Sequence, residues 1–344
     1  MVTYVDSINQ ALRDAMAADA SIYLLGEDIV DPYGGAFKVS RGLSTSFPDR
    51  VYSTPISEAA LVGVAAGMAL RGLRPIVEIM FGDFLSLCMD QLLNHATKYR
   101  AMYAGKVTSP IIVRTPVGAG RGYGPTHSQS LEKHFFGIPH FKVIAFSRFH
   151  DPALLLQSAL KEADPVLMLE PKLLYPLASW LPGSLPEQLQ MREAGRAEYP
   201  HFVVENFENG PPDVVLFTYG QGTCHLHELL IRLANQEIRI RAIIPSLLNR
   251  FDPEPLAALA REATYGCVVW EEGTAGFNWS SELIAQLALT VGVKANSVRC
   301  VSSLPTVIPA AKHLENAMLA TAAKVERAIE SLLAQGLGIP SGVL

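Results

Sequence analysis

Apolar residues in the first half of the chain fall into short runs that are separated by segments with helical spacing. The runs predict buried strands at residues 22–25, 74–80, 111–114, 141–145 and 166–170. Between the runs, apolar positions recur every three or four residues, as Ile8, Leu12 and Met16 do in a helix predicted over residues 3–18. Strands that alternate with helices are typical of a parallel, doubly wound sheet, so we predict an α/β fold.

The same alternation returns in the second half after an interruption. Residues 176–212 are rich in Pro, Gly and Glu and have weak periodicity, which indicates a linker. Further strands are predicted at residues 214–218, 239–244, 266–270 and 297–301, each followed by a helical pattern. We therefore predict two doubly wound domains, residues 1–175 and 213–344, joined by this linker.

One helical segment, residues 59–70, contains no charged residue and almost no bulky side chain. Gly63 and Gly67 lower its helix propensity but let another backbone approach closely, so we expect a fully buried helix in a tight contact. Glu58 precedes this segment in the first turn, where free backbone amides and the helix dipole favour negative charge. It is therefore either a helix-capping acid or a functional carboxylate held at an apolar wall.

Charge and composition narrow the range of partners. The net charge is −5 and the Lys and Arg residues do not cluster, which argues against nucleic acid as a partner. The amino terminus lacks the basic and apolar regions of a signal peptide, and no apolar run approaches the roughly 20 residues that span a bilayer. We expect a cytoplasmic protein without a membrane partner. The four cysteines are widely spaced and predict neither a zinc site nor a disulfide framework.

Two loops carry further candidate chemistry. Glu27 follows the first predicted strand, and ligand sites gather at the carboxyl ends of parallel strands, although a turn acid explains Glu27 almost as well. The loop at 118–124 is rich in glycine, but a dinucleotide-binding pattern starting at Gly118 requires glycine where the chain has Tyr123. The polar segment that follows, where we expect a helix to begin, contains His127; a lone histidine is usually structural.

Six motifs in the first half occur in an order that closely resembles one family. They are Gly-Glu-Asp at 26–28, the segment 33–43, Thr-Pro-Ile-Ser-Glu at 54–58, Gly-Leu-Arg-Pro at 72–75, Asp-Gln-x-x-Asn at 90–94 and His-Ser-Gln-Ser-Leu-Glu at 127–132. The chain resembles the β subunit of thiamine diphosphate-dependent 2-oxo acid dehydrogenases, the decarboxylating components of the pyruvate, branched-chain and acetoin complexes. The resemblance is dense over residues 3–175 and covers the rest in outline.

This resemblance implies a pyrimidine-binding domain of the transketolase-like superfamily followed by a transketolase C-terminal-like domain. It implies an α₂β₂ heterotetramer with thiamine diphosphate at the α/β interface and Mg²⁺ held mainly by the α subunit, whose Gly-Asp-Gly motif this chain lacks. The β subunit alone is then inactive. Family members often hold a structural monovalent cation such as K⁺, which the resemblance places near Ala159, Glu162 and Asp164.

The resemblance also assigns roles to individual residues. Glu58 matches the glutamate that hydrogen-bonds the cofactor's pyrimidine ring and drives its imino tautomer, and Phe84 matches the aromatic residue that stacks on that ring. His127 matches the active-site histidine near the substrate, a proton donor or a stabiliser of developing charge. Glu27 matches an acid near the same channel. Glu58 and His127 are thus the expected catalytic residues.

The second half departs from the family at residues 244–250, 275–278 and 303–309, which leaves the acyl acceptor open. The first hypothesis is decarboxylation of a 2-oxo acid followed by transfer to the lipoyl group of a partner acyltransferase. The alternative is transfer of a two-carbon unit from a ketose phosphate or 2-oxo acid to an acyl carrier protein or an aldehyde. A non-catalytic scaffold is a third hypothesis, against which the retained cofactor-side residues speak.

Overall fold

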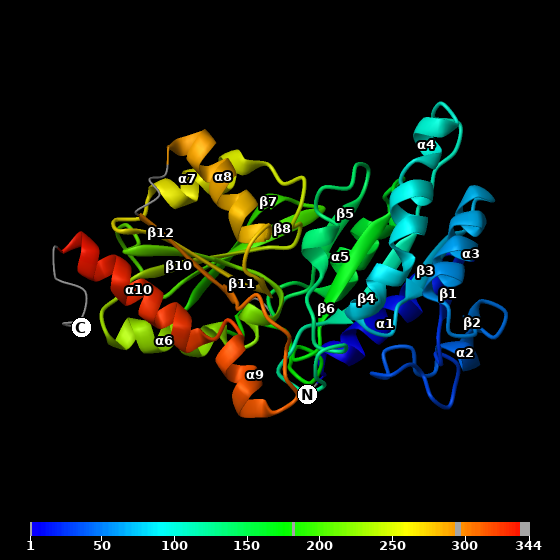
Figure 1. The fold of residues 1–344 in the computed structure, drawn as a ribbon, viewed down its shortest axis with the longest axis horizontal. Helices are drawn as coiled ribbons and strands as arrows, with labels where there is room; N and C mark the ends of the chain where they lie inside the picture. The colour runs from blue at the N-terminus through cyan, green and yellow to red at the C-terminus, as the bar shows by residue number, and fades with distance from the viewer. Residues whose placement is uncertain (1, 181–182, 293–296, 338–344) are drawn as a thin grey trace.

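Two six-stranded sheets, one in each half of the chain, form the framework of the fold and lie side by side (Figure 1). The computed structural model describes residues 2–180, 183–292 and 297–337. Residues 181–182 of the predicted linker, and 293–296 and 338–344 of the predicted second domain, lie outside the described residues. The prediction of two α/β domains is confirmed.

The first sheet is parallel throughout, with the strand order β2-β1-β3-β4-β6-β5. Its strands are β1 (Ile22–Gly26), β2 (Val51–Ser53), β3 (Arg74–Glu78), β4 (Ile112–Val117), β5 (Lys142–Ala145) and β6 (Val166–Pro171). Its helices are α1 (Tyr4–Ala18), α2 (Leu43–Ser46), α3 (Glu58–Leu70), α4 (Tyr99–Met102) and α5 (Pro152–Leu160). All five predicted strands are present, and β2 is a short addition to them.

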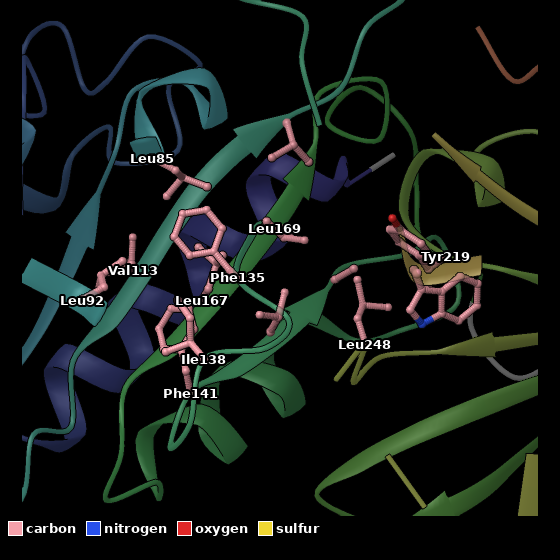
Figure 2. Packing of buried hydrophobic residues seen from close by; sticks show 14 of the residues in the cluster. Leu85, Leu92, Val113, Phe135, Ile138, Phe141, Leu167, Leu169, Tyr219 and Leu248 are labelled. Atoms are coloured by element: carbon pink, nitrogen blue, oxygen red, sulfur yellow. The ribbon is translucent and has the colours of Figure 1, made fainter. Parts of the chain in front are cut away.

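Each face of this sheet has its own apolar core. Successive strand residues point to opposite faces, so Ile112 packs with α1 and α5 while its neighbour Val113 packs with α3 and the turns that follow β3. Figure 2 shows Val113 beside Leu85 and Leu92 in the second of these cores. Because both faces are covered, the strands are continuous apolar runs, which is why the sequence predicts them well.

Helix α3 differs from the expectation that it is fully buried. Leu61 and Val62 pack in the core, but Gly63, Val64 and Gly67 are exposed. A Cβ atom added to Gly63 would lie 3.8 Å from its nearest neighbour, and one added to Gly67 would have no atom within 4 Å. The tight contact expected from the two glycines is therefore not made within the described part of this chain.

The second sheet has the order β12-β11-β9-β10-β8-β7 and is parallel from β9 to β12. These strands are β9 (Val214–Thr218), β10 (Ile240–Pro245), β11 (Gly266–Thr274) and β12 (Val298–Ser303). The helices around it are α6 (Leu226–Asn235), α7 (Pro253–Arg261), α8 (Trp279–Val291), α9 (Lys312–Met318) and α10 (Ala322–Gly336).

The prediction that residues 176–212 are a linker is wrong for residues 190–205, which form a β-hairpin. Strands β7 (Gln190–Arg196) and β8 (Tyr199–Glu205) pair antiparallel, and β8 adds the hairpin to β10 of the second sheet. β7 lies at the sheet edge and is mostly exposed, so it has no apolar run, and Pro200 in β8 argues against a central strand in the sequence. The second sheet therefore begins before residue 213.

No helix within the described ranges has the length and apolar character needed to cross a bilayer. All four cysteines are free thiols, and three of them are buried.

Candidate active site

The order of the first sheet reverses between β1 and β3. The chain passes from β1 to β2 on one side and then to β3 on the other, and the carboxyl edge at such a point is where open α/β sheets bind ligands. Glu27 follows β1, Glu58 opens α3 after β2, and Phe84 follows β3. The topology thus brings three of the predicted site residues to one edge of the sheet.

Glu58 and Glu27 are buried acids at the start of α3. Glu58 is 5% exposed and Glu27 is 4% exposed. The Ser57 amide donates to Glu27 Oε1 over 3.2 Å, while the Ser57 hydroxyl caps the helix by accepting from the Ala60 amide at 3.4 Å. Burial is the main cause that raises the pKa of Glu27, and the nearby charge of Glu58 adds to it.

The helix cap is therefore Ser57, and the carboxylate of Glu58 has a different environment. Among the described residues, no group donates a hydrogen bond to the Glu58 side chain. Neither Glu58 carboxylate oxygen is among the fully buried side-chain atoms that lack a partner, so both oxygens are within reach of solvent although the residue as a whole is buried. Glu58 is thus placed to accept a hydrogen bond from a donor outside this chain.

Three rings form a cluster after β3. The His127 imidazole meets the Phe81 ring with centroids 4.6 Å apart and the Phe84 ring with centroids 5.4 Å apart, both edge-on. The Thr126 hydroxyl lies 3.0 Å from His127 Nδ1. In the described residues His127 Nε2 has no partner, so this nitrogen can contact a ligand. The prediction of Phe84 and His127 as members of one site agrees with this geometry, while their roles stay predictions.

Lys172 belongs to the same cluster and was missed in the sequence. Its Nζ donates to the backbone oxygen of His127 over 2.6 Å and lies 5.3 Å from the centroid of the Phe81 ring. The side chain is buried, and burial lowers the pKa of Lys172 to about 8 against the opposing effects of Asp83 and other acids. The available signal was its place directly after the buried strand β6.

Asp83 connects the loops that follow β3 and β4. Its Oδ1 accepts from the Gln129 amide at 3.2 Å and from Gln129 Nε2 at 2.8 Å. The other carboxylate oxygen is buried without a partner. Together with Lys172, this contact holds the backbone at His127 and at Gln129. Residues 125–128 form a turn and a bend rather than the expected helix start, residues 129–131 are irregular, and a short 3₁₀ helix follows at Glu132–His134.

The residues predicted near a monovalent cation already have partners within the chain. Glu162 pairs with Lys142, Asp164 lies 3.7 Å from Arg100, and the Ala159 carbonyl accepts from the Glu162 amide. Over the ranges that the structure describes, no group of three or more His, Cys, Asp or Glu residues could hold a metal ion. These carboxylates do not fit a cation, so the K⁺ prediction would depend on backbone oxygens alone.

Comparisons with known proteins place both halves of the chain. Residues 1–178 match the family described as transketolase, pyrimidine binding domain, and residues 206–325 match the transketolase C-terminal domain. The chain is 33% identical over 340 residues to the beta subunit of acetoin:2,6-dichlorophenolindophenol oxidoreductase from Cupriavidus necator, covering 96% of this chain and 97% of that relative. It is 34% identical over 289 residues to the pyruvate dehydrogenase E1 component subunit beta from Gracilaria tenuistipitata var. liui, covering 83% and 84% of the two chains.

A solved structure supports the same architecture. The split gene transketolase, described as an inactive beta4 tetramer, superimposes with a TM-score of 0.69 and 19% identity, covering 96% of this chain and 97% of the other. At this identity the likeness shows the fold.

Proposed function

This chain belongs to the family of β subunits of 2-oxo acid dehydrogenases, with transketolase pyrimidine-binding and C-terminal domains, and from that premise we propose its function. It is the β subunit of a thiamine diphosphate-dependent enzyme that decarboxylates a 2-oxo acid and passes the acyl group to a lipoyl or other acceptor. The enzyme is active only with an α subunit.

The buried carboxylate of Glu58 carries this proposal. It is without a donor among the described residues and stands at the edge of the sheet where ligands bind. A protonated ring nitrogen of an aminopyrimidine is the kind of donor that it lacks, so the residues present fit the pyrimidine part of thiamine diphosphate. The Mg²⁺ and the diphosphate would be held mainly by the α subunit.

The remaining residues have roles that follow from their positions. When bound, thiamine diphosphate would supply the nucleophilic carbon and the electron sink that decarboxylation of a 2-oxo acid requires. Glu58 would accept the hydrogen bond of the pyrimidine ring, and this bond would be strong once the cofactor and the α subunit exclude water from the site. His127, with Nε2 free, delivers or accepts a proton at the substrate, and Phe84 supplies an aromatic wall.

The exposed face of α3 supports the need for an α subunit. Ala60, Gly63, Val64 and Gly67 lie on it, and this small apolar surface allows another backbone to approach closely. It begins two residues after Glu58, so a subunit that covers it also closes the site around the carboxylate. We propose that the α subunit occupies this face in an α₂β₂ heterotetramer. The cytoplasmic location stays a prediction.

The test is turnover by the assembled enzyme. The chain is co-expressed with an α-type subunit of its family, supplied with thiamine diphosphate and Mg²⁺, and assayed for carbon dioxide release from a panel of 2-oxo acids with dichlorophenolindophenol as electron acceptor. Release from one oxo acid is expected, and Glu58→Gln should abolish most of it without dissociating the complex. Glu254→Gln, a first-turn glutamate of α7 away from the site, is the control.

Other outcomes would change the assignment. An assembled, cofactor-loaded complex that releases no carbon dioxide but transfers a two-carbon unit from a ketose phosphate would favour the alternative reaction. Full turnover by Glu58→Gln would remove Glu58 from the chemistry. A complex that binds no thiamine diphosphate would leave the scaffold hypothesis.

A further inference from the structure

The glycine-rich loop at 118–124 lies between the two domains. Gly118, Gly120, Gly122 and Gly124 all have positive φ, at 96°, 92°, 71° and 77°. Left-handed residues that alternate with ordinary ones turn successive backbone amides toward one side and make a concavity that binds anions. The loop does not have the dinucleotide-binding pattern, so the anion in this concavity need not be a phosphate of a dinucleotide.

Two carboxylates of the second domain occupy this concavity. Glu272, at the end of β11, accepts from the Ala119 amide through Oε1. Glu315, in α9, accepts from the Gly120 amide at 2.9 Å and from the Gly122 amide at 3.2 Å. Glu315 is fully buried, so these charge-assisted hydrogen bonds are protected from water.

The glycines are required by the closeness of the second domain. A Cβ atom on Gly118 would lie 2.7 Å from Glu272 Oε2, and one on Gly122 would lie 3.1 Å from the Ala310 carbonyl oxygen. Between these points, Ala119 packs in a small buried cluster with Ile308 and Leu319. The loop is therefore held on the second domain by both polar and apolar contacts.

The same two carboxylates also act on the residue that holds His127. Lys172 donates to the His127 carbonyl oxygen, and Glu272 and Glu315, when ionised, both favour its protonated form against the effect of burial. The loop that they bind ends three residues before His127. The second domain thus binds the backbone of the loop that precedes His127. It also favours the charged form of Lys172, which holds the His127 carbonyl oxygen.

We propose that Glu272 and Glu315 are positioning residues, which fix His127 through the loop 118–124 and so make the second domain a determinant of the active-site geometry. The effect on catalysis rests on the proposed function, whereas the contact of Glu272 and Glu315 with the loop does not. Among the described residues neither carboxylate contacts the rings of Phe81, Phe84 or His127, so both act on His127 indirectly, through the loop and through Lys172.

Hydrogen exchange of the full chain tests the contact without any assay of activity. Glu315→Ala should accelerate amide exchange in peptides that contain residues 118–124 by roughly ten- to hundredfold, because charge-assisted hydrogen bonds of buried amides are lost. The control is Glu271→Gln: the neighbouring Glu271 accepts from the Trp279 and Ser280 amides, inside the second domain. Glu271→Gln should leave exchange at 118–124 unchanged.

Kinetics of the assembled enzyme test the consequence. Glu315→Ala should lower kcat roughly tenfold or more. It should also shift the limb of the pH dependence of kcat that is due to His127, which is identified as the limb that disappears in His127→Ala. Glu315→Gln keeps one of the two acceptor oxygens and should restore part of both the protection and kcat.

The proposal would be overturned if residues 118–124 of folded Glu315→Ala exchanged at the wild-type rate. It would also be overturned if Glu271→Gln accelerated exchange there as much as Glu315→Ala does. If Glu315→Ala does not fold, Glu315→Gln decides, with intermediate acceleration supporting the proposal and wild-type protection overturning it. A wild-type enzyme without turnover would contradict the proposed function, and the exchange result would still decide the contact.

Discussion

The ammonium group of Lys172 donates a 2.6 Å hydrogen bond to the backbone oxygen of His127, and it does so from a fully buried position. A buried lysine is retained only where its charge has partners, and here these are a carbonyl oxygen and surrounding acids. The contact joins the end of β6 to the segment after β4, and thereby sets the height of the imidazole above the sheet edge.

Lys172→Met should lower kcat of the assembled enzyme while the protein stays folded. Methionine keeps the length and the apolar stem but removes the donor. A hydrogen bond to a charged group contributes about 1.5–3 kcal/mol, so its full loss would lower kcat by roughly a factor of ten to a hundred. Steady-state kinetics measure the effect, and Lys161→Met, an exposed lysine after α5, is the control. Unchanged kcat in Lys172→Met would mean that His127 is held by its other contacts alone.

Gly67→Leu should prevent assembly with the α subunit without unfolding this chain. Gly67 is exposed in α3 with no atom near its missing Cβ, and leucine favours a helix over glycine by about 0.8–1 kcal/mol. The melting temperature should therefore stay the same or rise, while size-exclusion chromatography with the α subunit should show no complex. Ala17→Leu, on the exposed side of α1, should assemble normally. A normal complex of Gly67→Leu would place the interface elsewhere.

The elements that could be predicted from the sequence are those whose burial leaves a local pattern. The strands of the first sheet are apolar on both faces and were found, whereas β2 has three residues and β7 is mostly exposed. Helix α3 shows the limit of the same reasoning. Its glycines predict a close contact that the described part of this chain does not make, because composition cannot tell a contact inside the chain from a surface left open.

Some residues of the candidate site could be predicted from the sequence, and others could not. Glu27, Glu58 and His127 stand in contiguous motifs, so their grouping at one sheet edge could be expected from the sequence and the order of a doubly wound fold. Glu272 and Glu315 bind amides that are 153 and 195 residues away along the chain. No local pattern reports a pairing over that distance, and only the packing of the two domains brings it about.

The half-buried Glu272 should make stability depend on pH. Burial raises the pKa of Glu272 to about 8 from a value of 4.5, so the folded state binds its proton more tightly than the unfolded state. The resulting stabilisation is complete below about pH 4.5 and is lost as pH rises toward 8. Glu272→Gln imitates the protonated form, so its advantage over the wild type should grow between pH 5 and 8, by at most about 1.4 kcal/mol per pH unit.

Urea unfolding at pH 5, 6.5 and 8 measures this difference. Glu254→Gln, an exposed glutamate in α7, should show a constant difference from the wild type across the same range. A constant difference for Glu272→Gln as well would show that Glu272 ionises like an ordinary surface acid.

Arg114→Met should strongly destabilise the first domain. The Arg114 guanidinium, buried in β4, pairs with Glu78 and donates through Nε to Glu170 over 2.7 Å. The two acids accept further bonds of 2.6 Å from the Ser40 hydroxyl and the Tyr175 hydroxyl. Removing the cation leaves two buried carboxylates without compensation, which typically costs about 3–5 kcal/mol.

The free energy of unfolding from urea titrations at neutral pH measures the loss. Arg232→Met is the matched control, because Arg232 pairs with Glu326 over 3.5 Å at a partly exposed position, where an ion pair contributes about 0–1 kcal/mol. The triple change Arg114→Met, Glu78→Gln and Glu170→Gln should recover part of the stability, since no buried charge is then left unpaired. If Arg114→Met lost no more than Arg232→Met, the cluster would be held by its hydroxyl donors and not by the arginine.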